Sequence, residues 1–179
     1  MAPTQTAFEL LLDIDRRCRL LAADLPSHES RLATWSGIGF RIAERWYVAP
    51  MGDVVEVLQE PRMSTIPGVK PWVMGVSNLR GRLLPIMDLC GFFGHELTAV
   101  RKQRRVLVID HDPVFAGLMV DEVLGLQHFS LHGLDLSPPS AVPPSMAPFI
   151  QGHFQREQAW GVFSLVALAQ APGFLDVAL

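Results

Sequence analysis

Short strand-like segments separated by turn residues dominate the sequence from residue 35 onward. Apolar side chains at Ile38, Phe40 and Ile42 alternate with smaller or polar residues, and residues 43–45 indicate a turn before a second strand at 46–49. Comparable segments lie at residues 54–58, 73–79, 83–89, 106–109, 114–120, 149–154 and 160–165. A chain of many short strands divided by turns is typical of β-barrels and β-sandwiches, and here we predict barrels.

The order of strands and turns occurs twice along the chain. A proline-containing loop follows the first strands of each block, at Gln59–Pro71 and at Gln127–Pro148. We interpret this pattern as the duplication of a small β unit, which predicts two barrels packed together with a groove between them. Chance similarity among alternating strands remains the alternative. At one constant spacing the matched residues are Phe40 with Val108, Tyr47 with Phe115, Met51 with Met119, Asp53 with Asp121, and Val55 with Val123.

An amphipathic helix is predicted ahead of the strands. Thr6 and Glu9 have the spacing of a capping box, apolar residues then recur at helical spacing, and Pro26 ends the pattern. We expect this helix at Phe8–Leu25, inside an N-terminal extension of residues 1–34 that precedes a domain at 35–179. Packing against that domain is the favoured role, and docking into a partner is an alternative. Membrane-surface binding is least favoured, because the polar face carries charges of both signs.

Charge and composition exclude several classes of partner. The 179 residues carry a formal charge of −3 at pH 7, so we expect no binding to nucleic acid or anionic lipid. The basic run Arg101–Arg105 is interpreted as a solvated stretch that leads into a strand. No apolar stretch reaches the roughly 18 residues of a membrane helix, and no signal peptide is present. We expect a cytoplasmic protein without direct membrane insertion, with Cys18 and Cys90 as packed, reduced thiols.

No catalytic constellation is present in the sequence. The six histidines are scattered, and His128 and His132 lack the acidic neighbour that completes a helical metal-binding motif. Phosphate-binding, dinucleotide-binding and serine-hydrolase motifs are absent as well. We therefore predict no catalytic residue, no cofactor and no metal, and thus no enzyme. A small hydrolase that uses Asp88 or a histidine is kept as a disfavoured alternative.

The segment GVSNLRGRLLPIMDL, residues 75–89, is typical of a rigid β-hairpin. Gly81 can adopt a positive φ in the turn, and Asn78 can brace the turn by a hydrogen bond to nearby backbone. We expect the turn to display Arg80, whose guanidinium can make a two-pronged contact with a carboxylate.

Two other residues of this segment predict the path of its strands. Gly75 indicates a bulge or the close approach of another backbone, because only glycine leaves room for either. Pro85 has no N–H group to donate to a ladder, so we expect its strand to lie at a sheet edge or to be bulged there.

The same segment resembles the signature G-V-x-N-L-R-G-x-x-x-P-I-x-D-L of CheW-like coupling proteins in bacterial chemosensory systems. The matching residues are Gly75, Val76, Asn78, Leu79, Arg80, Gly81, Pro85, Ile86, Asp88 and Leu89. Residues 54–57 with the loop after them, and residues 116–123, resemble the family as well. The resemblance extends over about residues 35–170.

The resemblance implies a fold of two SH3-like five-stranded β-barrels around a shared core. These subdomains are expected at roughly residues 35–95 and 100–170, with exchange of strands between them left open. Family members are not enzymes. They bridge the cytoplasmic signalling tip of a chemoreceptor and the CheW-like domain of a CheA-type histidine kinase, so such a protein is recruited to receptor arrays at the membrane.

The resemblance also implies a protein-binding site. The arginine of the signature corresponds to Arg80, and the glutamate with which it forms an ion pair corresponds to Glu56. Together they are expected to shape the receptor-facing surface, while the kinase-facing residues are left unassigned. The predicted receptor-facing residues are Val55, Glu56, Val76, Asn78, Leu79, Arg80 and Gly81.

The N-terminal extension and three further segments resemble one branch of this family. That branch comprises the adaptors of type IV pilus chemosensory systems, which serve twitching motility. The three segments are residues 35–58, 80–94 and 173–179. A scaffold of a flagellar or other chemosensory array, and a regulatory domain of a larger kinase, remain as alternatives.

Overall fold

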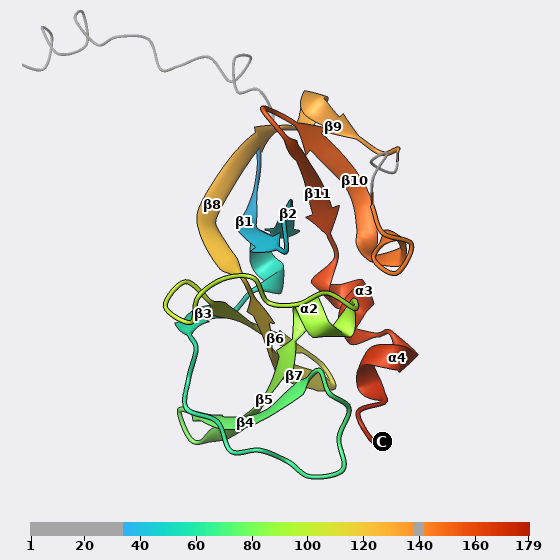
Figure 1. Ribbon diagram of the computed structural model, residues 1–179. Coiled ribbons are helices and arrows are strands. Elements are labelled where there is room, and N and C mark those ends of the chain that lie inside the picture. The colour runs from blue at the N-terminus through green and yellow to red at the C-terminus, as the bar shows by residue number, and fades with distance from the viewer. Residues whose placement is uncertain (1–33, 138–141) are drawn as a thin grey trace, which may run out of the picture. The chain divides into compact units, whose positions relative to one another are not determined.

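The structure, a computed structural model, describes residues 34–137 and 142–179 and is mainly β (Figure 1). The predicted helix at Phe8–Leu25 and Cys18 lie outside the described residues. The helical segments are short, and all but the last two, which follow β11, connect strands. They are η2 (Met51–Asp53), α2 (Leu89–Phe92), η3 (Leu131–Gly133), η4 (Ala147–Phe149), α3 (Leu165–Ala169) and α4 (Pro172–Leu175).

The strands form two sheets that curl like barrels, which confirms the predicted fold class (Figure 1). The first sheet has the order β8-β1-β2-β11-β10-β9, and the second has the order β3-β6-β7-β5-β4. The strands of the first sheet are β1 (Thr34–Ile42), β2 (Arg45–Pro50), β8 (Glu122–Ser130), β9 (Leu134–Asp135), β10 (Ile150–Gln155) and β11 (Ala159–Phe163). Those of the second are β3 (Glu56–Gln59), β4 (Val73–Leu79), β5 (Arg82–Asp88), β6 (Arg105–His111) and β7 (Val114–Val120).

The two halves of the chain exchange strands. One sheet joins β1 and β2 of the first half to β8, β10 and β11 of the second, and the other joins β6 and β7 to β3, β4 and β5. Four pairs join the halves, the parallel pairs β2–β11 and β5–β7 and the antiparallel pairs β1–β8 and β3–β6. The pairs within each half are antiparallel. If the strands are numbered within each half and the two-residue β9 is left out, both sheets have the same order. It is the third strand of one half, the first and second strands of the other half, and then the fifth and fourth strands of the one. Neither half therefore forms its sheet alone.

Gly75 and Gly152 hold corresponding positions in β4 and β10. Both have a positive φ, 144° and 155°, and both interrupt the register with the following strand. A Cβ on Gly75 would lie 2.3 Å from the carbonyl oxygen of Ser64, and one on Gly152 would lie 2.6 Å from that of Asp135. Glycine is thus required where the chain turns back against each sheet and completes its curl. The predictions of a bulge and of a close approach at Gly75 are both confirmed.

The prediction that the strand of Pro85 lies at a sheet edge is wrong for β5 as a whole, which lies between β4 and β7. The register shift of the β4–β5 pair lies between Val73 and Gly75, away from the proline. Pairing with β7 begins only at Ile86, so no ladder needs an N–H group from Pro85 on that side. The first half of β5 is therefore the part that lacks a second neighbour.

Four strand ends also differ from the predictions. β8 continues past Gln127 to Ser130, because β1 pairs with it over that stretch. Phe149 belongs to η4 and not to the following strand. Leu89 and Leu165 begin α2 and α3, since the side chains of the residues before them accept hydrogen bonds from first-turn amides at 3.0 Å and 3.1 Å.

A buried aspartate connects segments that follow strands of both sheets. Asp121, between β7 and β8, is fully buried and accepts hydrogen bonds from the amides of Ala43 and Ala99, both at 2.7 Å. The Thr98 hydroxyl at 3.2 Å and the Cys90 thiol at 3.4 Å donate to the same carboxylate. Ala43 lies in the β1–β2 turn, whereas the other donors lie in α2 and the loop after it. One side chain thus holds the turn against the loop.

The protonation of Asp121 links this contact to pH. Burial by itself would raise the pKa of Asp121, but the hydrogen bonds from Ala99 and Ala43 outweigh that effect and lower the pKa below its ordinary value. The ionised carboxylate therefore stabilises the fold above pH ~4, near the pKa of an unfolded aspartate. That contribution is lost as the pH falls through the lowered pKa of the folded state.

We predict that Asp121→Asn lowers the free energy of unfolding by about 1–3 kcal/mol at neutral pH, because a donor group replaces one of two buried acceptor oxygens. The deficit should shrink as the pH falls below ~4, because protonation of Asp121, first in the unfolded chain and then in the folded protein, removes the stability that the ionised carboxylate gives the wild type. Urea denaturation across this pH range measures both effects. Glu157→Gln, on an exposed carboxylate, is the control, and a deficit of equal size at every pH would contradict the assignment.

Candidate functional site

The β4–β5 hairpin has a two-residue turn made of Arg80 and Gly81. Both have a positive φ, 51° and 85°, which is the conformation of a type I′ turn. The Asn78 side chain accepts a hydrogen bond from the Gly81 amide at 2.9 Å, so the predicted brace of the turn is present. The sequence did not predict the strained backbone of Arg80, because asparagine, aspartate or glycine is usual at that position.

Arg80 forms an ion pair with Glu56 of β3. Arg80 Nη2 lies 2.9 Å from Glu56 Oε1. The Arg80 side chain is 78% exposed, whereas that of Glu56 is 25% exposed. The carboxylate thus orients the guanidinium from the protein side while most of the guanidinium stays open to solvent. The pairing itself agrees with the sequence resemblance.

A second ion pair lies beside the first. Arg82 Nη1 lies 2.8 Å from Asp110 Oδ2, and the Arg82 guanidinium carbon lies 3.7 Å from the centre of the Phe115 ring. Stacking and ion pairing together fix this side chain more firmly than a single contact would. Sequence reasoning missed these three residues. Asp110 and Phe115 face each other across β6 and β7, and β5 reaches them only through its parallel pairing with β7.

The two ion pairs border a surface hollow of about 200 Å³. Val55 is 59% exposed at its rim, and Leu79 is half-buried. Of the predicted residues, Val76 does not line the hollow but pairs with Ser64. Asn78 and Gly81 shape the turn beside it. The lining residues are Val55, Glu56, Leu79, Arg80, Arg82, Val108, Asp110 and Phe115.

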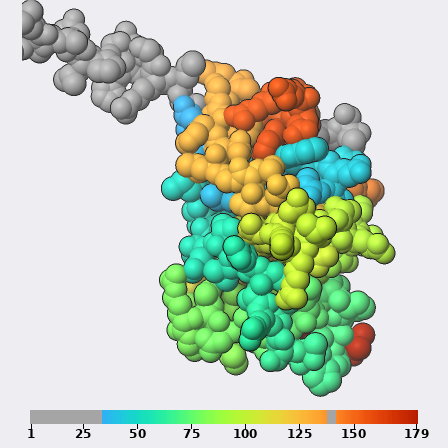
Figure 2. Space-filling model, turned by 60° about the vertical axis from the view of Figure 1, so that its left-hand side comes forward, coloured from blue at the N-terminus to red at the C-terminus, as the bar shows by residue number. Residues whose placement is uncertain are grey.

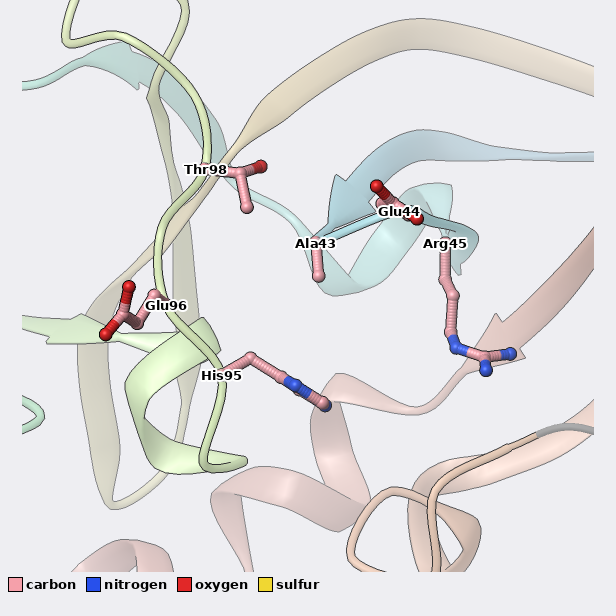
Figure 3. Close-up of a pocket in the computed structure, with 6 residues that line it drawn as sticks. All are labelled: Ala43, Glu44, Arg45, His95, Glu96 and Thr98. Carbon is pink, nitrogen blue, oxygen red and sulfur yellow. The ribbon is translucent and has the colours of Figure 1, made fainter.

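A second hollow, of about 520 Å³, lies between the β1–β2 turn and the loop after α2 (Figure 3). His95 and Arg45 reach into the open space, whereas Glu96 extends to the other side of its loop (Figure 3). Thr98, at the rim, donates to Asp121. This hollow therefore lies over the buried carboxylate, and its rim carries charges of both signs.

The described residues give no geometry for metal binding. In residues 34–137 and 142–179, no three side chains of histidine, cysteine, aspartate or glutamate are grouped to hold an ion. His128 lies in β8 and His132 in η3, so their four-residue spacing does not place them on one helix face. Burial raises the pKa of the Cys90 thiol to about 12, so this cysteine is not an activated nucleophile. None of the helices in the described part is long and apolar enough to cross a membrane.

Comparison with known proteins places this geometry in a family. The model of the CheW-like domain matches residues 36–172. The chain belongs to the CheW-like family. The match covers both sheets and both ion pairs, so the resemblance predicted from the signature is confirmed.

Three relatives define the similarity of this CheW-like chain. It is 60% identical over 182 residues to protein PilI of Pseudomonas aeruginosa, covering 100% of each chain. It is 31% identical over 86 residues to the chemotaxis protein CheW of Helicobacter pylori, covering 48% of this chain and 52% of that one. The crystal structure of the scaffolding protein TtCheW from Thermoanaerobacter tengcongensis matches with a TM-score of 0.65 and 25% identity, covering 78% of this chain and 94% of that one.

We predict that the two arginines differ in their contribution to stability. Arg82→Ala should lower the free energy of unfolding by about 1 kcal/mol, because it removes both the ring contact and the ion pair. Arg80→Ala should change it by less than about 0.5 kcal/mol, because that side chain is mostly exposed. Chemical denaturation of the two variants and of Arg82→Lys provides the comparison, and equal losses for both alanine variants would refute the distinction.

Proposed function

We propose that this protein is a non-enzymatic adaptor that couples a methyl-accepting chemoreceptor to a CheA-type histidine kinase and thereby controls type IV pilus twitching motility. Membership of the CheW-like family supports the adaptor role. The 60% identity to PilI over the full length of both chains supports the pilus assignment. A scaffold of a flagellar or other chemosensory array is the second candidate, favoured by the partial match to CheW of Helicobacter pylori.

The observation that carries the proposal is the backbone of Arg80. A φ of 51° costs free energy in a residue other than glycine, and here the strained backbone belongs to the residue whose side chain the hairpin displays. Glu56 orients the guanidinium but leaves most of it in solvent. Such a group can bind a carboxylate of a partner with little further loss of side-chain entropy.

The receptor tip would lie across the hollow beside this arginine. A helix of the receptor would place a carboxylate on Arg80 and an apolar side chain against Val55 and Leu79. The receptor-facing surface is then the predicted set of Val55, Glu56, Val76, Asn78, Leu79, Arg80 and Gly81. The CheW-like domain of the kinase would bind elsewhere on the protein, so that the adaptor holds both partners at once and is recruited to receptor arrays at the membrane.

We predict that Arg80→Glu weakens binding of a purified receptor signalling fragment at least about tenfold. The new carboxylate would repel the receptor carboxylate that the Arg80 guanidinium attracts. Binding of the kinase CheW-like domain should remain within about twofold. Adding Glu56→Arg should restore part of the receptor affinity, since the two substitutions together restore an ion pair between positions 56 and 80. Isothermal titration calorimetry with both partners measures these changes.

The matched control is Arg45→Glu, the same charge reversal on an exposed arginine of the β1–β2 turn. It should leave receptor binding unchanged. A folded Arg80→Glu protein with wild-type receptor affinity would remove this surface from the proposal. Loss of affinity with no rescue by Glu56→Arg would keep the surface but remove the ion pair as its organiser.

A further inference from the structure

Five cations lie where the loop after α2 meets the segment after β3. Arg101, Lys102 and Arg104 belong to the loop, Arg105 begins β6, and Arg62 follows β3. We call these five residues the cationic patch. The loop and the segment after β3 lie against each other on one face, in yellow-green and teal (Figure 2). The sequence alone indicated an ordinary solvated run.

Three of the four arginines of the cationic patch, Arg101, Arg104 and Arg105, are held by contacts within the protein. Arg101 Nε lies 2.9 Å from one carboxylate oxygen of Glu60, and Arg104 Nη1 lies 3.8 Å from the other. Arg104 Nε also donates to the Ala99 carbonyl at 2.9 Å. Arg105 Nη1 donates to two carbonyl oxygens of its own loop, at 2.7 Å and 2.8 Å. Much of the side-chain entropy that binding would cost is therefore lost already on folding.

Glu60 forms ion pairs with Arg101 and Arg104 from a nearly buried position. Its side chain is 9% exposed, whereas the Arg101 side chain that it contacts is 70% exposed. Arg62 and Lys102 have no ion-pair partner among the described residues. The outward surface is therefore positive, although a carboxylate lies beneath it.

The cationic patch stands out against the charge of the whole chain. Five cations and the carboxylate of Glu60 leave a local charge of +4, so the remainder of a chain with net charge −3 carries −7. Exposed charges act over about 8 Å at physiological salt, so the concentrated positive surface is felt by a partner that approaches it.

An apolar residue lies next to these charges. Val100 is 64% exposed, and its carbonyl accepts a hydrogen bond from the Gln103 amide at 2.8 Å, which closes the turn of the loop. An exposed valine on a fixed turn offers an apolar contact beside the cations.

We propose that the cationic patch binds an acidic segment of a partner protein. Its carboxylates would pair with Arg62, Arg101 and Lys102, and an apolar side chain between them would contact Val100. The fixed guanidinium of Arg101 and the exposed Val100 next to it match a short peptide that carries carboxylates and an apolar side chain. A membrane surface would need no fixed geometry and is attracted by mobile lysines and arginines spread over a wider area. This surface and its partner are independent of the receptor contact proposed at Arg80.

The test uses the full-length protein and a short fluorescein-labelled peptide of alternating glutamate and leucine. Anisotropy titrations should show saturable binding that weakens as salt rises. Lys102→Glu and Arg62→Glu should each weaken it at least about threefold, and together at least about tenfold. In the described part neither side chain makes a hydrogen bond, ion pair or ring contact that its replacement would break, and Lys102→Gln provides a milder variant. Circular dichroism melting verifies that the variants are folded.

Arg45→Glu is again the matched control and should change the peptide affinity by less than about twofold. A peptide with lysine in place of each glutamate should not bind. Absence of saturable binding, or equal losses for Arg45→Glu and Lys102→Glu, would overturn the proposal. Binding through Lys102 to vesicles that contain phosphatidylglycerol, without binding to the acidic peptide, would assign the surface to a membrane and overturn it as well.

Discussion

The contact on which the two sheets depend is the buried carboxylate of Asp121. It satisfies amides of the β1–β2 turn and of the loop after α2, two segments that are far apart in the sequence. An uncompensated buried charge would be costly, but here four donors surround it and the pKa falls. The same loop then carries Arg104, whose contacts with the Ala99 carbonyl and Glu60 extend the polar contacts to the surface.

The strands themselves could be predicted because alternation and turn residues are local signals. Exchange of strands between the halves was left open, since it depends on pairs between distant strands, which leave no local pattern in the sequence. These pairs are β1–β8, β2–β11, β3–β6 and β5–β7. Pro85 shows the consequence. A proline argues for an edge strand, yet β5 gains a second neighbour one residue later. Likewise, the length of β8 depends on β1, a distant partner.

The candidate site also has one part that the local sequence predicts and another that depends on the pairing of distant strands. The turn of Asn78, Arg80 and Gly81 follows from local chemistry, and the resemblance supplied Glu56 as the partner of Arg80. Arg82 could not be linked to Asp110 and Phe115 from the sequence, because that contact needs β5 beside β7. The basic run at Arg101–Arg105 was read as solvated for a similar reason: its counter-ion, Glu60, comes from the other half of the chain.

Exchange of strands has a consequence for how the domain can be divided. Each sheet contains strands from both halves, so a cut in the connection between β5 and β6 would not release two separate barrels. The fragments would remain paired, and separating them would require each sheet to lose two strand pairs, β1–β8 and β2–β11 in one and β3–β6 and β5–β7 in the other. Because four strand pairs connect the halves, the two sheets are tied to each other, and the domain is not two barrels joined by a single hinge.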